Sequence, residues 1–560
     1  MKEKITIGLL FSLLTIYGYG QAKSDIIPLA PKQNRRPENY QLQKSNYSLN
    51  ELKNNFSEKM MQLSEKQYNT ITEVNAKGKW KPTPESIDTH KAPEWFEDAK
   101  FGMFIDWGLW SVAGYAPKKE KGAMYPDWYE LRLDTDSAFI KYHEKNWGKD
   151  FKRDDFIPMF TASQYNAEKL AKVAVEAGMK YVVPFSKHHG GFCLWPSSYT
   201  QRDAGDMGPK RDLIQPMVES CKKQGLKFGF YFSVEEWEYP LIDAQGNIKP
   251  HLWETKNVPS MEELEKRASG KIPVKDFAKD YIVPQAVEFI DKYDPDLIWY
   301  DGEWTTEATE LRTYEISSYF YNHAEGRKEV AVNDRYGTKD GKWLRFVRGD
   351  FFTSEYHSLT DENKKSTHAW EECRGISQSF GYNWQDTDAN VISSKAFIDM
   401  FVDIVAKGGN LLLIVNLDGQ GALPELQEKR LMDIGKWLKV NGEGIYSTRT
   451  FTRQNDGNVA FTRSKDNHYV YAIMKEWPGQ ELKLKGIKPL TGSKIEMLGY
   501  NHSLEWIYSD EGITVKLPVK LQNERIRPCE HAWVLKIRLI DINENINNKS
   551  NLISKALTEK

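Results

Sequence analysis

The sequence predicts an α/β protein in which a (β/α)8-type barrel is followed by a small C-terminal antiparallel β-sandwich. Short continuous apolar runs alternate with amphipathic helical segments through most of the chain. This alternation is typical of parallel sheets whose strands are buried on both faces. Further along, the helical pattern ends and only short alternating strands follow. No glycine-rich nucleotide-binding loop follows any apolar run, which favours a barrel over a doubly wound open sheet.

The N-terminus has the pattern of a cleaved secretory signal peptide, assigned to residues 1–20. Lys2 and Lys4 precede an apolar run over 5–19, and small Gly20 closes the segment. The run is shorter than an ordinary membrane span, although an uncleaved anchor is the alternative. We therefore expect a periplasmic or secreted protein.

Residues 21–90 are polar and are predicted to form an extension packed on the main domain. Ser48 is placed to cap a helix over 49–75. Apolar residues recur there at helical spacing, namely Leu52, Phe56, Met60 and Leu63.

The barrel is assigned to residues 91–445. Its strands are predicted from apolar runs at 100–106, 180–186, 227–233, 296–301, 329–334 and 410–416. Helices are expected at 165–178, 211–224, 276–292, 306–323 and 393–407. At least six strand–helix repeats fit a (β/α)8-type barrel better than an open sheet.

Residues 446–540 are predicted to form the sandwich, and residues 541–560 a polar tail. The sandwich strands are VAFTRS, YVYAIMK, KIEML, ITVKL and HAWVLKIRL. Each is short and alternating, and turn residues separate them, which is typical of antiparallel sheets.

The composition and net charge bear on the kind of partner that the protein binds. The chain has 77 Lys and Arg against 79 Asp and Glu, a net charge of −2, which gives no support for binding nucleic acid or an anionic membrane. Its 18 Trp and 28 Tyr suit stacking on sugars but fill cores equally well. The cysteines, Cys193, Cys221, Cys373 and Cys529, are widely spaced. They form no CxxC metal pattern and identify no disulfide bridge.

Polar residues gather at the C-terminal ends of the predicted strands, where barrel enzymes place their working groups. These residues are Asp106, His188, His189, Glu235, Glu236, Asp301, Glu303, Asp334, Arg335 and Glu355. Tryptophans are interleaved with them, at Trp107, Trp110, Trp195, Trp237, Trp299 and Trp304. Carboxylates, imidazoles and an arginine without a phosphate-binding loop suit acid–base chemistry on a neutral polyhydroxylated substrate, so the combination indicates a sugar.

Glycoside hydrolysis requires two carboxyl groups in unlike environments, and Asp301 and Glu355 are the candidates. Asp301 ends an apolar strand, and Gly302 leaves its front face open. Glu355 lies among aromatic residues, and an apolar setting would raise its pKa and keep it protonated as an acid. The alternatives are a capping or salt-bridging aspartate and a surface glutamate.

Two other kinds of site are disfavoured. Adjacent strand-end residues such as His188 and His189 are expected to point in opposite directions, so the pair is not predicted to hold a metal ion. No HxH or HExxH pattern accompanies them, and hydrogen bonding to substrate hydroxyls is the preferred interpretation. No GxSxG motif is present for a serine hydrolase.

Several ordered blocks of the sequence resemble those of glycoside hydrolase family 29, the α-L-fucosidases. The blocks are KFGMFIDWGLWSV, KHHGGFCLWPSSYT, GPKRDLI, GLKFGFYFSVEEW, PDLIWYDGEW, VNDRYG and GGNLLLIVN, within residues 90–445. The resemblance implies a barrel followed by a sandwich, with a carbohydrate as the partner. It also implies a retaining mechanism through a covalent glycosyl–enzyme intermediate, with no cofactor.

The resemblance also assigns roles to residues. The family's nucleophile matches Asp301, the acid/base of bacterial members matches Glu355, and Glu371 in another block is the second choice for the acid/base. The matching sugar-binding positions are Trp128, His188, His189, Tyr231, Trp299 and Arg335. Phe380 matches an aromatic residue that lines the pocket for the sugar's C6 methyl group.

The chain departs from the family's usual pattern around the sugar. Asp106 stands where the family usually has His, and Asp127 where it usually has Glu; both are predicted to bind substrate. Gly190 replaces an acidic residue after the histidine pair, and Gln201 with Arg202 replaces an Asp–aromatic pair. Exchanging an imidazole for a carboxylate removes a donor and leaves an acceptor. The pattern predicts a retained mechanism on an unusual sugar or linkage.

The leading interpretation is an exo-α-L-fucosidase that removes terminal fucosyl residues from oligo- or polysaccharides by double displacement. One alternative keeps the mechanism but changes the sugar, to an α-L-galactoside or a sulfated fucoside. In the sulfated case Arg202 is either an anion contact or a solvated surface residue. The other alternative is a non-catalytic carbohydrate-binding homologue, which the presence of both carboxylates disfavours.

Overall fold

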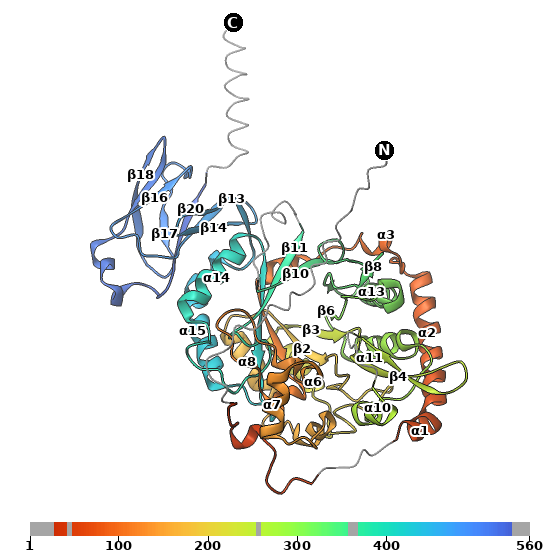
Figure 1. Cartoon of the computed structure of the whole chain (residues 1–560). Helices are drawn as coiled ribbons and strands as arrows, with labels where there is room; N and C mark the ends of the chain where they lie inside the picture. The colour runs from red at the N-terminus through yellow and green to blue at the C-terminus, as the bar shows by residue number, and fades with distance from the viewer. Residues whose placement is uncertain (1–26, 42–47, 254–258, 357–367, 540–560) are drawn as a thin grey trace, which may run out of the picture.

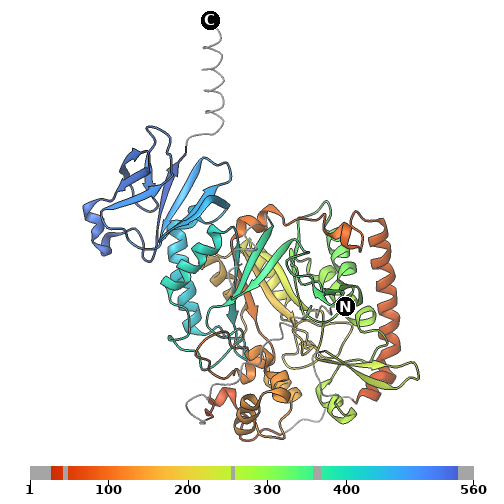
Figure 2. The ribbon, with the colours of Figure 1, turned by 45° about the horizontal axis from the view of Figure 1, so that its top comes forward.

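A computed structural model describes residues 27–41, 48–253, 259–356 and 368–539. The predicted signal peptide and polar tail lie outside these residues and stay predictions. Figure 1 shows a barrel with helix α2 along one side and the C-terminal strands attached at the other, and Figure 2 shows the same arrangement from a tilted direction.

Eight parallel strands form the barrel in the order β10-β11-β12-β1-β2-β3-β6-β7. They are β1 (Phe101–Asp106), β2 (Tyr181–Lys187), β3 (Lys227–Ser233), β6 (Leu297–Asp301), β7 (Ala331–Val332), β10 (Phe351–Glu355), β11 (Ala369–Gly375) and β12 (Asn410–Asn416). A parallel bridge between Asn333 and Phe351 joins β7 to β10 and nearly closes the sheet. The predicted (β/α)8-type barrel is confirmed.

Two barrel strands, β10 and β11, were not predicted, and β7 is shorter than expected. Both unpredicted strands place polar side chains at fully buried positions, Thr353 in β10 and Glu371 in β11. A polar residue facing a barrel interior interrupts the apolar run by which a parallel strand is identified. Their sequences therefore lack the pattern that identified the other strands.

Helices cover the outside of the barrel. The larger ones are α7 (Ser137–Asn146), α8 (Ala167–Glu176), α9 (Gln215–Gln224), α11 (Val283–Tyr293), α13 (Thr313–Ala324), α14 (Ser394–Ala406) and α15 (Glu425–Asn441). The shorter ones are α3 (Pro84–Ile87), α4 (Glu94–Ala99), α5 (Trp110–Ala113), α6 (Tyr129–Thr135), α10 (Met261–Arg267) and α12 (Ala308–Leu311). Side-chain caps fix where several begin: Asn166 accepts from Lys169 N at α8, and Ser393 accepts from Ala396 N at α14.

Two hairpins are inserted between the barrel elements. They are β4 (Glu238–Ile242) with β5 (Ile248–Leu252), and β8 (Thr338–Lys339) with β9 (Lys342–Trp343). Each follows the C-terminal end of a barrel strand, β3 and β7 respectively, so both add to the rim where the predicted site lies.

The N-terminal helix begins where the sequence predicted but is interrupted. Ser48 Oγ accepts from Glu51 N (3.2 Å) and Ser48 N donates to Glu51 (2.8 Å), which forms a capping box. The segment divides into α1 (Leu49–Leu52), a π-helical turn (Lys53–Ser57) and α2 (Glu58–Lys77). Ser64 Oγ donates to Asp280 O (2.6 Å), so α2 is held against the barrel.

The C-terminal strands form one antiparallel sheet in the order β13-β14-β15-β20-β17-β18-β19-β16. Their bounds are β13 (Thr448–Asp456), β14 (Val459–Ser464), β15 (Tyr469–Met474), β16 (Glu481–Lys485), β17 (Ile495–Met497), β18 (Ser503–Ser509), β19 (Gly512–Lys516) and β20 (Trp533–Arg538). Phe461 of β14 and Leu484 of β16 pack in one core, so the sheet folds over as the predicted sandwich.

The sandwich shares buried contacts with the barrel. Tyr471 and Val534 belong to the same apolar cluster as the barrel strands, and Trp437 Nε1 of α15 donates to Ala532 O (2.8 Å). All four cysteines are free, and three of them are buried. No helix within the described residues is long and apolar enough to cross a membrane.

Candidate active site

Asp301, the last residue of β6, lies at the C-terminal end of the barrel among three polar partners. Its Oδ1 accepts from Arg335 Nη1 (2.6 Å), its Oδ2 accepts from the Tyr231 hydroxyl (2.7 Å), and His189 Nε2 lies 3.4 Å from Oδ2. Burial alone would raise the pKa of Asp301, but Arg335, His189 and Tyr231 outweigh it and hold the pKa well below its usual value. Asp301 is therefore a buried carboxylate that stays ionised.

Arg335 connects Asp301 to Glu355. Its Nη2 forms an ion pair with Glu355 Oε1, and its Nε donates to Thr353 Oγ1 (3.1 Å). The Glu355 side chain keeps 27% of its surface exposed, whereas that of Arg335 is almost fully buried. The expectation of an apolar setting for Glu355 is therefore wrong: it lies at the rim, beside a buried cation, although aromatic residues flank it in sequence.

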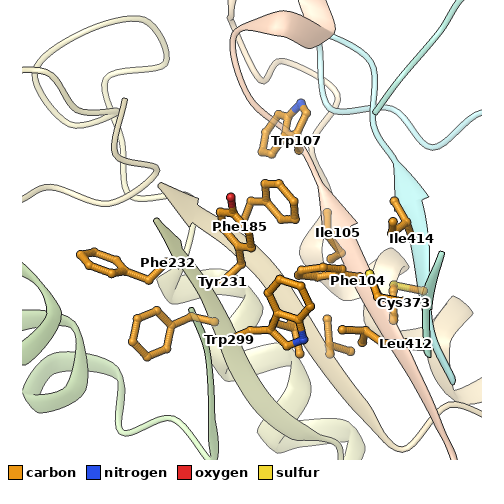
Figure 3. Packing of buried hydrophobic residues seen from close by; sticks show 14 of the residues in the cluster. Phe104, Ile105, Trp107, Phe185, Tyr231, Phe232, Trp299, Cys373, Leu412 and Ile414 are labelled. Atoms are coloured by element: carbon orange, nitrogen blue, oxygen red, sulfur yellow. The ribbon is translucent and has the colours of Figure 1, made fainter. Parts of the chain in front are cut away.

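Aromatic rings inside the barrel support the site from below. Phe185 and Tyr231 stack with centroids 3.9 Å apart, and Trp299 lies 5.9 Å from Tyr231. The Arg335 guanidinium lies 4.4 Å from the Trp299 ring centroid. Figure 3 shows Phe185, Tyr231 and Trp299 around Phe104 in the barrel interior. These contacts fix the Tyr231 hydroxyl and the Arg335 fork against Asp301.

The two histidines lie together, which corrects the expectation that they point in opposite directions. Both follow the end of β2, where the strand alternation no longer applies, and their ring centroids are 4.2 Å apart. His189 Nδ1 contacts Ser233 Oγ (2.5 Å). Burial lowers the pKa of His188 well below its usual value, and the buried His188 Nδ1 has no hydrogen-bond partner within the described ranges. Two imidazoles therefore meet at one side of the site.

Asp106 and Asp127 form a buried acidic pair beside the histidines. Asp106 Oδ1 accepts from Trp110 Nε1 (2.9 Å), and His188 Nε2 lies 3.8 Å from Asp127 Oδ2. Among the described residues, Asp106 Oδ2 and Asp127 Oδ1 have no hydrogen-bond partner. Burial raises the pKa of both carboxyls well above their usual value, and the charge of Asp127 adds to the effect on Asp106. Such buried, unsatisfied oxygens are costly unless a ligand supplies donors.

Phe380 and Gly381 bring an apolar ring next to this acidic pair. A Cβ on Gly381 would lie 3.0 Å from Asp127 N and 3.3 Å from Asp106 Oδ1, so any larger residue would crowd the acidic pair. The Phe380 ring is almost fully buried and packs on Tyr125, with centroids 5.7 Å apart. The pocket therefore has an apolar side as well as hydrogen-bonding groups.

Four tryptophans form a wall beside the histidines. Trp304 stacks on Trp253 with centroids 5.1 Å apart, and it lies 5.6 Å from Trp128. Trp237 belongs to the same cluster, and the Trp128 and Trp304 rings are each 5.7 Å from His189. Trp253 was not identified from the sequence because it directly follows the β4–β5 hairpin, and no apolar run predicts that hairpin.

Glu371, the second choice for the acid/base, lies deep in the barrel. In the strand register it pairs with Asn410, the first residue of β12, whereas Asp106 pairs with Asn416, the last. Trp299 Nε1 donates to Glu371 Oε1 (3.0 Å), and the Tyr181 hydroxyl donates to Oε2. Burial raises the pKa of Glu371 to about 7 against these hydrogen bonds. Glu371 thus lies toward the end of the barrel opposite the site.

Glu303 is a buried acid that the sequence noted without assigning a role. Neither carboxyl oxygen has a hydrogen-bond partner in the part of the chain that the structure describes, and Arg345 Nε lies 3.8 Å from Oε1. Burial raises its pKa to about 7, although the charge of Arg335 opposes the change. Glu303 is thus a second buried acid near the nucleophile candidate.

Several other strand-end residues serve the scaffold. Trp107 donates to Asp418 O and Trp195 donates to Glu288, so neither ring faces the site. Glu236 pairs with Lys187 (3.0 Å) and Lys271 (2.7 Å). Burial alone would raise the pKa of Glu236, but the two lysines lower it to about 2.

Asp334 and Arg202 also make contacts within the protein. Asp334 accepts from Thr353 N and Phe346 N, both at 3.0 Å, and so orders the loop after β7. Arg202 is buried and donates to Asp154 (2.6 Å). The expectation that Arg202 contacts a sulfate of the substrate or lies solvated on the surface is therefore wrong.

The arrangement provides acid–base and hydrogen-bonding groups. Within the described residues, no group of three or more His, Cys, Asp and Glu side chains is placed to hold a metal ion. An ionised carboxylate, a rim carboxyl on the same guanidinium, two imidazoles and the acidic pair lie together among aromatic rings. Such a set suits the recognition of hydroxyl groups and the cleavage of a bond next to Asp301.

Comparison with known proteins gives a consistent family assignment. The family model described as alpha-L-fucosidase matches residues 67–443, and that described as the alpha-L-fucosidase C-terminal domain matches residues 453–538. An alpha-L-fucosidase of Branchiostoma floridae is 31% identical over 469 residues, covering 82% of this chain and 96% of the relative. Human plasma alpha-L-fucosidase is 31% identical, covering 81% and 92% respectively.

Solved structures show the same similarity. The crystal structure of Thermotoga maritima alpha-fucosidase with a mechanism-based inhibitor superposes with a TM-score of 0.67 at 31% identity, covering 82% of this chain and 100% of that one. Structure and sequence therefore agree over the barrel and the sandwich.

Proposed function

Because the chain belongs to the α-L-fucosidase family of glycoside hydrolases, we propose that it removes terminal α-L-fucosyl residues from oligo- or polysaccharides with retention of configuration. The contact of one guanidinium with both carboxyls carries this proposal. Retaining glycosidases place a nucleophile and an acid/base about 5–5.5 Å apart. Because Arg335 contacts both Asp301 and Glu355, it keeps these two carboxyls close together, as such a pair requires. No cofactor is required.

Asp301 is the nucleophile in this mechanism. As an ionised carboxylate it attacks the anomeric carbon, and an ester bond to C1 forms as the glycosidic bond breaks. Glu355 gives its proton to the leaving oxygen. The same carboxylate then takes a proton from water, which attacks C1, breaks the ester and releases the sugar with its original configuration.

Glu355 suits the acid/base role better than Glu371. Its partly exposed carboxyl at the rim is open to a leaving group and to water, whereas Glu371 is fully buried and bonded to Tyr181 and Trp299. A general acid must come within hydrogen-bond reach of the group it protonates.

The sugar is held by the acidic pair, the histidines and the aromatic rings. Asp106 and Asp127 have unpartnered oxygens that ring hydroxyls would satisfy, and His188 and His189 lie beside them. Phe380 offers an apolar contact for a C6 methyl group, and Trp128 offers a ring face. This division favours fucose, which has hydroxyls on one side and a methyl group on the other.

An α-L-galactoside is the second candidate substrate. Gly381 brings Phe380 next to Asp106 and Asp127, so an unpartnered oxygen of this pair would also accept from an additional hydroxyl at C6. The burial of Arg202 against Asp154 removes the observation that favoured a sulfated fucoside. The predicted signal peptide supports a secreted or periplasmic location for either activity.

The first experiment assays purified protein on aryl α-L-fucoside beside the aryl α-L-galactoside. We expect fucose release that is lost in Asp301→Ala, and proton NMR should detect the α-anomer first. Appearance of the β-anomer first would contradict retention. Preferential galactoside hydrolysis would replace the sugar while keeping the mechanism, and no turnover of either substrate would contradict the proposed activity.

A further inference from the structure

The loop between β7 and β10 carries large apolar side chains in solvent at the rim of the barrel. In the described part of the chain, 53% of Trp343, 39% of Phe346 and 65% of Val347 are exposed. Arg335 lies near the start of this loop, and the loop ends at β10, whose last residue is Glu355. Exposed apolar groups gathered beside a polar pocket are typical of a binding surface rather than of ordinary solvent-facing structure.

Trp343 is fixed to the segment that carries the nucleophile candidate. Trp343 Nε1 donates to Trp304 O (3.0 Å), and Thr338 N donates to Thr306 O (2.8 Å). Gly337 (φ 126°) permits this approach, because a Cβ there would lie 2.8 Å from Ala308 N. The hairpin β8–β9 is therefore held in place, and the exposed indole does not need to be ordered when a ligand binds.

The exposed indole is joined to the tryptophan wall through its hydrogen bond to the backbone oxygen of Trp304. Trp304 follows Asp301 by three residues, so their Cα atoms are at most about 11 Å apart. The Trp304 ring packs on Trp128 and lies 5.7 Å from His189, which contacts Asp301. Trp128, Trp304 and Trp343 thus extend from the nucleophile candidate to the outer rim.

The backbone beside Trp343 is strained. Phe346 has a positive φ of 61°, which bulky residues rarely adopt. Such a conformation costs free energy, and it persists only where contacts with the surrounding structure compensate for that cost. Phe346 N donates to Asp334 Oδ2 (3.0 Å) and Arg345 donates to Thr353 O (3.0 Å). These bonds tie the apolar loop to the residues flanking Arg335 and Glu355, so its position is set relative to the reacting groups.

We propose that Trp304 and Trp343 form a stacking surface for the sugar ring of the leaving group, the pyranose to which the terminal residue is attached. This inference rests on the proposed function and extends it beyond the pocket for the terminal sugar. A pyranose has an apolar face of C–H groups, and aromatic rings bind such faces while leaving the hydroxyls in water. The occupant is therefore the next sugar of a glycan.

The test compares two substrates that share the terminal sugar but differ in the leaving group. α-L-Fucosyl fluoride has a single-atom leaving group that cannot reach Trp343, whereas a fucosylated trisaccharide can. In Trp343→Ala we expect the ratio of kcat/KM for the trisaccharide to that for the fluoride to fall about tenfold, the equivalent of about 1.4 kcal/mol, mainly through KM. Trp343→Phe should recover most of the ratio, since it keeps a ring without the Nε1 donor.

The matched control is Tyr508→Ala, an exposed aromatic residue of the sandwich (46% exposed), which should leave the ratio at the wild-type value. An unchanged ratio in Trp343→Ala would overturn the stacking surface while leaving the proposed function intact. If the wild type cleaves neither substrate, the proposed function fails. The stacking surface is then tested separately, by measuring trisaccharide binding with calorimetry. Trisaccharide binding to Asp301→Ala should then weaken about tenfold when Trp343→Ala is added, and equal affinities would overturn it.

Discussion

At the scale of single residues, Arg335 determines the electrostatics of the site. One buried guanidinium contacts Asp301 and Glu355 and lies over the Trp299 ring. A buried charge of this kind is stable only because the Asp301 carboxylate neutralises it. The same contact keeps Asp301 ionised at acidic pH, which is the state that a nucleophile requires.

Replacing Arg335 by Gln should shift the acidic limb of the activity profile to higher pH. Arg335 lowers the pKa of Asp301, so its loss raises that pKa and protonates the nucleophile at pH values where the wild type is active. The measurement is kcat/KM against pH on an aryl fucoside. Arg348→Gln, which breaks the rim pair with Asp88 (2.7 Å), is the control, and an unshifted limb in Arg335→Gln would contradict the assignment.

Glu355→Gln and Glu371→Gln form a matched pair that separates the two candidate acids. Loss of a general acid costs about 10²- to 10⁴-fold, so Glu355→Gln should lower kcat by that amount on a poor leaving group. Azide should restore turnover of an activated fucoside in this variant. Glu371→Gln should retain most of the activity, because its carboxyl lies on the far side of Trp299. A larger loss in Glu371→Gln than in Glu355→Gln would reverse the assignment.

Part of this residue picture was accessible from sequence. Asp301, Arg335, His188 and His189 were identified because they follow apolar strands, and the structure brings them together. The setting of Glu355 was not accessible, because the residue that contacts it comes from another strand end. A histidine pair beyond a strand likewise has no alternation to predict its direction.

At the scale of elements, β11 shows how a polar strand is accommodated in a barrel. Glu371 points into the interior, where the Trp299 indole and the Tyr181 hydroxyl satisfy its oxygens. Strands such as β12, with the run Leu411–Val415 fully buried, were predicted from hydrophobicity alone. Strand β11 was not, because its inward carboxylate is compensated only by residues distant in sequence.

Glu371→Gln should also change the pH dependence of stability. The folded-state pKa of Glu371 is raised from 4.5 to about 7, so the native state binds a proton that the unfolded state has released. Stability from this group is present below about pH 4.5 and is lost as pH rises toward 7. Glu371→Gln should therefore melt close to the wild type at pH 4 and above it at pH 8, by thermal denaturation; equal melting temperatures at both pH values would contradict the shift.

At the scale of the whole molecule, the sandwich and the barrel share one interface of apolar and polar contacts. Val534 and Tyr471 pack with the barrel core, and Lys475, which follows β15, pairs with Asp403 of α14 (2.7 Å). Sequence predicted both domains but not this connection, because no local pattern indicates which face of a strand meets another domain.

The shared interface predicts one cooperative unfolding transition for the full chain. Val534→Ala removes two buried methyl groups at the interface and should lower that single transition temperature, by a cost of about 1–3 kcal/mol. Val515→Ala, which lies in the core of the sandwich alone, is the matched control and should also keep one transition. Differential scanning calorimetry that resolves two transitions in the wild type would contradict the coupling.

The state of the cysteines has a practical consequence. All four thiols are free, Cys193, Cys221 and Cys373 are buried, and burial raises the pKa of the partly exposed Cys529 to about 11. Thiol-reactive reagents therefore find few ionised, accessible cysteine side chains on the native protein. A cysteine introduced at an exposed position of the sandwich would be the preferred point for attaching a fluorophore or a solid support, without first removing the natural ones.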